Sequence, residues 1–398
     1  MPDEINLRYE ADRRRFYELD SLRGVAALTV VLHHFSRICP EALIHVLIRT
    51  PLRLLIAGHQ AVILFFLLSG FALTLPYKKK NSLSYVPFLV KRVCRIYLPY
   101  LGALALAILC DLSFPGHGPY DNYWINFTWS QPVTARLILQ HVLFLGNYDW
   151  FQFNTAFWSL VYEMRISLVF PFIAFAVLRL QTIWLIICAV VLSLAFFPAA
   201  LLFSTVLHLS SLDAAINTTR TFHYAAFFII GSVLAKHLHT INRWYVRLKP
   251  VHAAILALVA LALYGFSEAS SLVQRFSIPE DLFDWPVAAG AVMLIVFAMN
   301  SRAFHSFLTS RTIHYLGERS YSLYLIHGTI LFALIHTLMG RVRMDVLFLI
   351  YLAITLTVTE FFYRLMEHPS MLLGRRLTAV RKILPQTVPS SIASGPPA

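Results

Sequence analysis

Long apolar segments constrain the fold of this chain more than any other feature of its sequence. A helix needs about 20 mostly apolar residues to cross the hydrocarbon core of a bilayer. About ten segments of the chain reach or approach that length. The sequence therefore predicts an all-α, polytopic integral membrane protein with about ten transmembrane helices. The segments lie near residues 22–39, 57–76, 96–114, 156–177, 182–201, 220–237, 251–268, 286–300, 321–340 and 346–366.

The amino-acid composition agrees with a location in a membrane. Hydrophobic residues make up 58% of the chain and charged residues 13%, a balance far from that of a soluble domain. The 33 Lys and Arg residues outnumber the 20 Asp and Glu residues, but they gather in alternate loops. Membrane topology explains this distribution better than binding to nucleic acid, so no nucleic-acid partner is expected.

The same distribution predicts that both termini lie in the cytoplasm, because loops on that side of a membrane carry an excess of Lys and Arg. The intervening loops hold fewer basic residues, with Arg37, Arg49, Arg53, Arg341 and Arg343 as exceptions. The residues expected on the cytoplasmic side are Arg13, Arg14, Arg15, Lys78, Lys79, Lys80, Lys91, Arg92, Arg95, Lys236, Arg243, Arg247, Lys249, Arg302, Arg311, Arg319, Arg375, Arg376, Arg381 and Lys382.

One membrane domain, residues 19–370, is expected between a cytoplasmic N-terminal segment, residues 1–18, and a cytoplasmic tail, residues 371–398. The first segment has no apolar core before Leu19 and does not resemble a cleaved signal peptide. The last residues, "TVPSSIASGPPA", are predicted to be disordered because they offer nothing to bury. The four cysteines lack the spacing of a metal site or a disulfide framework.

Three polar residues mark the first apolar segment. Asp20 precedes it and is expected to cap its helix. Arg23 follows in the first turn, and His34 comes eleven residues later, which is almost three turns of an α-helix. Arg23 and His34 are therefore predicted to share one face, roughly 16 Å apart along the axis, while His33 points elsewhere.

Arg23 and His34 bring different chemistry to different depths of the membrane. A guanidinium near the surface binds phosphate, and an imidazole inside the membrane exchanges a proton near neutral pH. A long donor with an anionic head and a reactive tip, such as acyl-coenzyme A, matches this arrangement. Two other interpretations stay open: Arg23 is an anchor at the cytoplasmic surface, and the histidines hydrogen-bond neighbouring helices.

Five stretches, taken in order along the chain, resemble the membrane-bound acyltransferase 3 family. In the first stretch an Arg is followed after ten residues by a His, and the fourth ends in a Glu after a Trp-Ser-Leu run. Together they span nearly the whole chain. The stretches are "LDSLRGVAALTVVLHHF", "GHQAVILFFLLSGF", "FLVKRVCRIYLPY", "FWSLVYE" and "LGERSYSLYLIH".

The resemblance implies a multi-pass enzyme of the bacterial inner membrane. Such an O-acyltransferase moves an acyl group, usually acetyl, from cytoplasmic acyl-coenzyme A to a hydroxyl of a carbohydrate or related acceptor. No metal is implied. Carried over to this sequence, the family's motif residues are His34 and Glu163 as catalytic groups and Arg23, Arg92 and Arg95 as ligands of the donor.

Arg92 and Arg95 are three residues apart on a predicted helix, so one face would carry two guanidinium groups able to clamp a phosphate. An interfacial segment that contacts lipid head groups explains the same residues. Glu163 lies about two turns inside its span, where a free carboxylate is costly. It is expected to orient His34 or stabilise its protonated form, the alternative being a neutral carboxyl group bonded to a backbone carbonyl.

Other polar residues have weaker patterns. Ser69 lacks the context of a nucleophile, and a Ser-Gly pair is typical of helices that approach closely. His59 and His327 are candidates to line a cavity. The aromatic stretch at 120–130 is expected in an outer loop, either at the membrane interface or stacked on a sugar. No histidine spacing indicates a metal site.

A transporter or flippase of polysaccharide or lipid-linked precursors is the alternative function, because intramembrane Arg, His and Glu also line transport pathways. The inverted repeats common in transporters are not visible in the sequence. Membrane lipids and a carbohydrate or lipid-linked acceptor are the expected partners. The sequence leaves open the acceptor, the acyl group, the choice between direct transfer and a covalent intermediate, and the oligomeric state.

Overall fold

The structure, a computed structural model, describes residues 16–78, 84–114, 122–144, 146, 149–206, 212–266 and 280–379. These residues form helices joined by loops, and none of them lies in a β-strand, which confirms the all-α prediction. Each predicted apolar segment coincides with a helix. The helices are α2 (Tyr17–Ser36), α4 (Gly58–Thr74), α6 (Leu98–Ser113), α9 (Phe157–Arg179), α10 (Thr182–Val206), α11 (Leu212–Lys236), α13 (Pro250–Tyr264), α15 (Asp284–Asn300), α18 (Ser320–Leu338) and α19 (Met344–Phe362).

Shorter elements connect these helices. They are α3 (Glu41–Arg49), η1 (Pro51–Ile56), η2 (Leu75–Lys78), α5 (Tyr85–Arg92), η3 (Val93–Tyr97), α7 (Tyr123–Phe127), α8 (Ala135–Leu143), α12 (Leu238–Val246), η4 (Glu280–Phe283), α16 (Arg302–Leu308), α17 (Arg311–Glu318), η5 (Tyr363–Glu367) and α20 (His368–Leu377). The start of the predicted tail thus belongs to helix α20, while residues 1–15 and 380–398 lie outside the described residues.

Seven helical segments of the described chain are long and apolar enough to cross a membrane. An eighth would combine α11 with α12, which meet at 66°. Helix α13 is shorter, and the polar residues Asp20, Arg23, His33 and His34 lower the mean hydropathy of α2. The chain is therefore an integral membrane protein, but the predicted number of about ten spans is not confirmed.

Helix α2 packs against α4, α17 and α18 inside the bundle. It begins at Tyr17, and its N-cap residue Phe16 packs edge-on against Phe71 with 5.7 Å between ring centroids. Asp20 lies within the helix, where its carboxylate is 3.6 Å from Nη1 of Arg23. The expectation that Asp20 caps the helix is wrong, because the helix already begins at Tyr17, three residues before Asp20.

Small residues allow α4 and α11 to cross closely, as the Ser-Gly pair at 69–70 predicted. A Cβ atom on Gly70 would lie 2.1 Å from the carbonyl oxygen of Phe228. One on Gly231 would lie 2.0 Å from the carbonyl oxygen of Leu67. Any larger residue would push the two backbones apart, so the glycines fix the position of α4 and with it the position of Ser69.

Two π-helical turns, η3 and η5, interrupt the path of the chain near one another. In each, an amide bonds the carbonyl five residues earlier: Leu98 to Val93, and His368 to Tyr363. A proline follows at once, Pro99 or Pro369, and its missing N–H removes an ordinary helical hydrogen bond. The turns are joined by an ion pair of 2.8 Å between Arg95 in η3 and Glu367 in η5.

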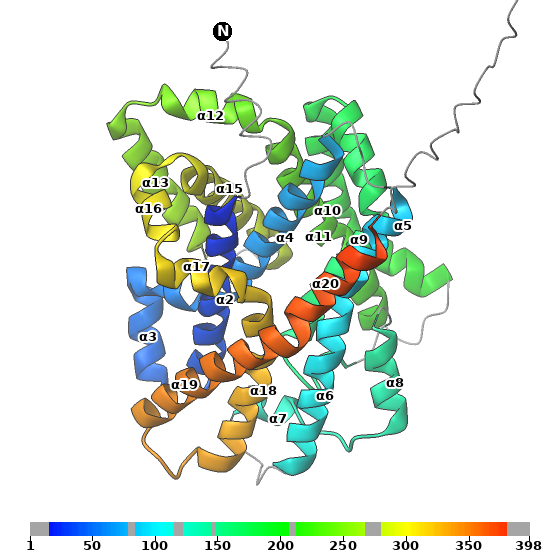
Figure 1. Ribbon diagram of the computed structural model, residues 1–398, viewed down its shortest axis with the longest axis vertical. Helices are drawn as coiled ribbons and strands as arrows, with labels where there is room; N and C mark the ends of the chain where they lie inside the picture. The colour runs from blue at the N-terminus through cyan, green and yellow to red at the C-terminus, as the bar shows by residue number, and fades with distance from the viewer. Residues whose placement is uncertain are drawn as a thin grey trace, which may run out of the picture.

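Figure 1 shows α12 at one end of the molecule and α7 and α8 at the opposite end, which we call the α12 end and the α7 end. Helix α2 runs from the side of the α12 end toward the α7 end, and α20 crosses obliquely to contact α5 and η3 (Figure 1). Exposed apolar side chains on α9 and α10 form a surface suited to lipid. They include Phe172, Phe175, Ile183, Trp184, Val191 and Leu194.

Candidate active site

A small cavity of about 170 Å³ lies between α2, α4, α9, α18 and the α5–η3 segment. We call it the arginine cavity, because three of the predicted site residues that line it are arginines. Apolar and aromatic side chains form the rest of its wall. Its lining includes Arg23, Arg92, Arg95, Glu163, Ser69, Ser159, Phe65 and Tyr324.

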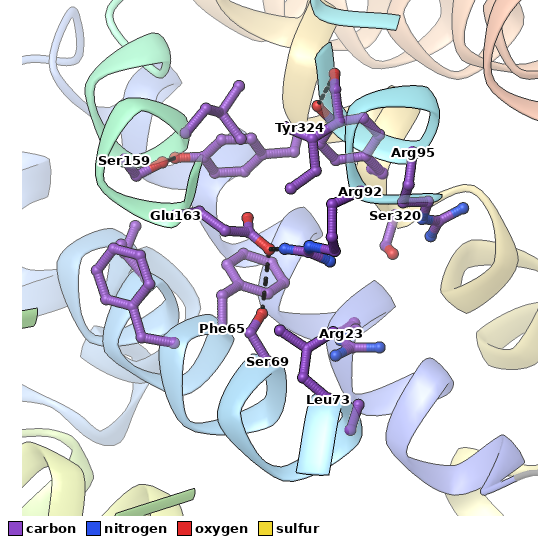
Figure 2. Close-up of a pocket in the computed structure, with 16 residues that line it drawn as sticks. Arg23, Phe65, Ser69, Leu73, Arg92, Arg95, Ser159, Glu163, Ser320 and Tyr324 are labelled. Atoms are coloured by element: carbon purple, nitrogen blue, oxygen red, sulfur yellow. Dashed lines mark hydrogen bonds and ion pairs between the residues drawn. The ribbon is translucent and has the colours of Figure 1, made fainter. Parts of the chain in front are cut away.

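Glu163 is paired with Arg92 in this cavity. Nη2 of Arg92 donates to Oε1 of Glu163 at 2.7 Å, and the Ser69 hydroxyl donates to the same oxygen at 3.3 Å (Figure 2). Nε of Arg92 donates to the Ser167 hydroxyl at 3.1 Å. The expected contact between Glu163 and His34 therefore does not occur. The face of α9 that carries Glu163 is turned toward α4 and α5, where a guanidinium neutralises the buried charge.

Arg92 and Arg95 line the same cavity but have different partners. Arg95 donates from Nη1 to Glu367 at 2.8 Å and also contacts the sulfur of Met371. Figure 2 shows the Arg92 side chain directed at Glu163 and the Arg95 side chain directed away from it. Both side chains thus reach one cavity, but Arg95 lies within the π-helical turn η3, which changes the helical phase after Arg92 and gives Arg95 different partners.

Arg23 is held at the place where the arginine cavity joins a wider vestibule of about 730 Å³. Its Nη2 donates to the carbonyl oxygen of Leu68 at 3.1 Å, and Asp20 lies 3.6 Å away. Arg23, Arg95, Ala72 and Ser320 line both spaces. The two spaces therefore adjoin at these four residues, with Glu163 in the lining of the smaller one.

His34 lies in a different space, the histidine cavity, which has a volume of about 790 Å³. Three histidines, several aromatic rings and two ion pairs line it. The ring of Trp124, from the predicted outer aromatic stretch, stacks on His34 at 5.8 Å with 18° between planes. Its lining includes His33, His34, His59, Trp124, Trp158, Tyr162, Arg220, Asp281 and Asp284.

The hydrogen bonds of His34 fix the tautomer of its imidazole. Nδ1 of His327 lies 3.1 Å from the carbonyl oxygen of Leu323, which can only accept, so a neutral His327 carries its proton there. Nε2 of His327 is then an acceptor, and it lies 2.8 Å from Nδ1 of His34. His34 donates from Nδ1, and its Nε2 keeps a lone pair. Its imidazole therefore has the form that a general base requires.

His33 has a separate anchor, since its Nδ1 lies 2.8 Å from the carbonyl oxygen of Ile56. The two neighbouring histidines have different hydrogen-bond partners, but both line the histidine cavity, so His33 does not point away from the space that His34 faces. The two rings meet edge-on with 5.4 Å between centroids. His33 is thus the matched neighbour of His34, with the same chemistry and a different partner.

Sequence reasoning missed a buried network beside His33. Asp284 accepts hydrogen bonds from Nε2 of His59 at 2.6 Å and from Nε2 of His223 at 3.0 Å. Arg220 and Asp281 form a bidentate ion pair, with distances of 3.0 and 3.2 Å. The partners lie 225 and 61 residues apart, so no local spacing could have revealed them.

Within the residues that the structure describes, no side chain lines both the arginine cavity and the histidine cavity. Helix α9 passes between them, with Ser159 and Glu163 on one side and Trp158 and Tyr162 on the other. The hydroxyl groups of Ser159 and Tyr324 are hydrogen-bonded at 2.6 Å, and Figure 2 shows the two side chains directed toward one another. The ring of Tyr324 also meets the ring of Phe65 edge-on at 5.6 Å.

The predicted site residues thus fall into two groups. Arg23, Arg92, Arg95 and Glu163 come together in the arginine cavity, and His34 lies in the histidine cavity. Tyr324 and His327, both on α18, connect the arginine cavity to His34. Tyr324 lines that cavity, and its ring lies 5.8 Å from the ring of His327, the partner of His34. The geometry suits two reactants that approach from opposite sides.

Comparison with known proteins gives a consistent result. A family model described as an acyltransferase domain matches residues 16–364. The O-acetyltransferase PaAT-1 of Phomopsis amygdali is 26% identical over 378 residues, which cover 81% of this chain and 73% of that protein. No solved structure matches the chain. The matched domain includes every residue of the arginine cavity and the histidine cavity and ends inside η5.

Proposed function

This chain belongs to the acyltransferase 3 family and is an acyltransferase, and on that premise we propose that it moves an acetyl group from acetyl-coenzyme A to a hydroxyl of a carbohydrate acceptor. The hydroxyl as acceptor atom is supported by the relative in Phomopsis amygdali, which is named as an O-acetyltransferase. A carbohydrate is supported by the aromatic rings of the histidine cavity, which offer flat apolar faces beside hydrogen-bonding groups.

Acetyl-coenzyme A enters through the vestibule and passes its thioester end through the arginine cavity toward His34. The donor is long, flexible and anionic at one end, and the space is wide and basic at one end and narrow at the other. Arg23 and Arg95, where the two spaces join, provide charge-assisted hydrogen bonds to phosphate oxygens. Glu163 acts through Arg92, because its carboxylate fixes the direction of that guanidinium.

His34 acts as the general base on the acceptor hydroxyl. Its unprotonated Nε2 accepts the proton while the hydroxyl oxygen attacks the thioester carbonyl carbon. The new C–O bond forms, the C–S bond breaks, and the coenzyme A thiolate leaves and is protonated. His327 is a positioning residue, because its hydrogen bond to Nδ1 keeps the His34 lone pair on the nitrogen that the reaction uses.

The donor approaches from the cytoplasm and the acceptor from the other side of the membrane. Helix α12 contains Arg243 and is flanked by Lys236, Arg247 and Lys249, which supports a cytoplasmic location for the α12 end. Helix α2 carries Arg23 near its start and His34 near its end. The acetyl end of the donor passes Phe65 and Tyr324 to reach His34. The contact between these two rings must therefore open during each transfer.

One observation carries this proposal: a single helix, α2, presents the guanidinium of Arg23 to one cavity and the imidazole of His34, with its lone pair at Nε2, to another. The test uses membranes that contain the full-length protein and [¹⁴C]acetyl-coenzyme A. We expect label in alkali-labile esters together with stoichiometric release of free thiol. Thiol release without ester label would show hydrolysis of the donor. Label that remains entirely in unreacted acetyl-coenzyme A would contradict the proposed transfer.

A further inference from the structure

Helix α20 follows the end of the matched acyltransferase domain and forms a wall of the vestibule. The match ends at residue 364, and α20 spans His368–Leu377. Four side chains of α20 line the vestibule: His368, Met371, Leu372 and Arg375. A segment outside the matched domain thus completes the space that leads to the arginine cavity.

The position of α20 is fixed by close packing against the α5–η3 segment. Gly374 is buried, and a Cβ atom in its place would lie 2.9 Å from the Cβ atom of Cys94. The sulfur of Met371 contacts the guanidinium of Arg95. These two contacts hold one face of the helix against η3 and place Arg375, the residue after Gly374, at the wall of the vestibule.

Arg375 differs from the other arginines of this space in its partners. Arg23 lies 3.6 Å from Asp20, Arg92 lies 2.7 Å from Glu163, and Arg95 lies 2.8 Å from Glu367. Among the residues that the structure describes, the guanidinium of Arg375 has no hydrogen bond or ion pair. No carboxylate of the described residues therefore balances its positive charge.

We propose that Arg375 binds the 3′-phosphate of coenzyme A. This inference rests on the donor proposed above and extends it to a residue outside the matched domain. With the thioester carried to His34, roughly 16 Å from Arg23 along α2, the pantetheine arm runs through the arginine cavity and the pyrophosphate lies at Arg23 and Arg95, where the two spaces adjoin. The ribose and its 3′-phosphate then lie farther out in the vestibule. A phosphate monoester carries nearly two negative charges, which match an unpaired guanidinium.

The test measures binding, so it needs no acceptor. Full-length protein in lipid nanodiscs is titrated with coenzyme A and with dephospho-coenzyme A, which lacks the 3′-phosphate. We expect the wild type to prefer coenzyme A. Arg375→Gln lowers the affinity for coenzyme A by about tenfold and leaves the affinity for dephospho-coenzyme A unchanged, because one charge-assisted hydrogen bond is lost.

Arg376→Gln is the matched control, because Arg376 is the next residue, is exposed and does not line the vestibule. It removes the same charge and should leave both affinities unchanged. Equal losses in the two variants, or an equal loss for both nucleotides in Arg375→Gln, would overturn the assignment of Arg375. If the wild type bound neither nucleotide, the donor proposal itself would fail. If the wild type bound coenzyme A normally and Arg375→Gln bound it equally well, only the assignment of Arg375 would fail.

Discussion

His34 and His327, which are 293 residues apart in the sequence, share a hydrogen bond of 2.8 Å between Nδ1 and Nε2. His327 is buried and is itself anchored to the Leu323 carbonyl on its own helix. Two imidazoles and a carbonyl thus form a chain in which each proton has one position. The chain ends at the Nε2 lone pair of His34, beside the histidine cavity.

The first prediction concerns His34 and its neighbour. His34→Ala should lower the rate of acetyl transfer by about 10²–10⁴, the usual contribution of a general base, while the protein remains inserted and folded. His33→Ala should be milder, because His33 bonds the Ile56 carbonyl and takes no part in the chain. Initial rates with [¹⁴C]acetyl-coenzyme A measure both variants. An inactive His33 variant with an active His34 variant would reverse the assignment of the base.

The second prediction separates positioning from structure at His327. His327→Gln places an amide oxygen within reach of Nδ1 of His34, so the rate constant kcat should fall by about tenfold. His327→Ala leaves Nδ1 without an acceptor and should cost more. In both variants the KM for acetyl-coenzyme A should stay constant, since His327 does not line the arginine cavity. Equal rates in the two variants would argue against control of the tautomer.

The third prediction concerns the pair of Glu163 and Arg92, whose side chains are 19% and 12% exposed. Glu163→Gln leaves a mostly buried guanidinium without its counter-charge and should destabilise the protein by about 1–3 kcal/mol. Arg92→Gln should do the same and also weaken binding of coenzyme A. The double variant should lose less than the sum of the two, because the charges are removed together. Thermal unfolding in detergent gives this comparison, and strictly additive losses would mean that the two residues are not coupled.

The fourth prediction concerns the side on which each reactant is used. Sealed inverted membrane vesicles expose the cytoplasmic face, so external [¹⁴C]acetyl-coenzyme A should label an acceptor enclosed in the lumen. The label should resist an esterase added outside and become sensitive once detergent opens the vesicles. Label that the esterase removes from intact vesicles would place the acceptor on the donor's own side and leave a cytoplasmic transferase.

The helices were predictable, because they depend on local sequence. Apolar runs specify helices wherever lipid surrounds the chain. The face that Arg23 and His34 were expected to share stays a prediction, and the two side chains line different cavities. The family was also recognisable from five ordered motifs, and the match over residues 16–364 confirms it. The three arginines that the resemblance assigned to the donor line one cavity, and Glu163, expected beside His34, lies with them instead.

The partners of these residues were not predictable, because they depend on contacts between distant segments. A π-helical turn directs Arg95 away from Arg92, and the only local signal for it is the proline that follows. The sequence predicted that Glu163 orients His34, but the carboxylate forms an ion pair with Arg92 on another helix. Asp284 carries no motif at all, although it joins two histidines that lie 225 and 61 residues away.

Phe65, Tyr324 and Ser159, which line the arginine cavity, have a consequence for the proton gradient across the membrane. Membranes store energy as a proton gradient, and a water-filled path through a protein would discharge it. In the structure the rings of Phe65 and Tyr324 are in contact and the Tyr324 and Ser159 hydroxyl groups are hydrogen-bonded, and we expect these contacts to close that path. We expect proteoliposomes that contain the resting protein to hold a pH gradient as well as protein-free liposomes do, and Phe65→Gly to make them leak. The same few side chains would then let an acetyl group pass during transfer and block the flow of protons at rest.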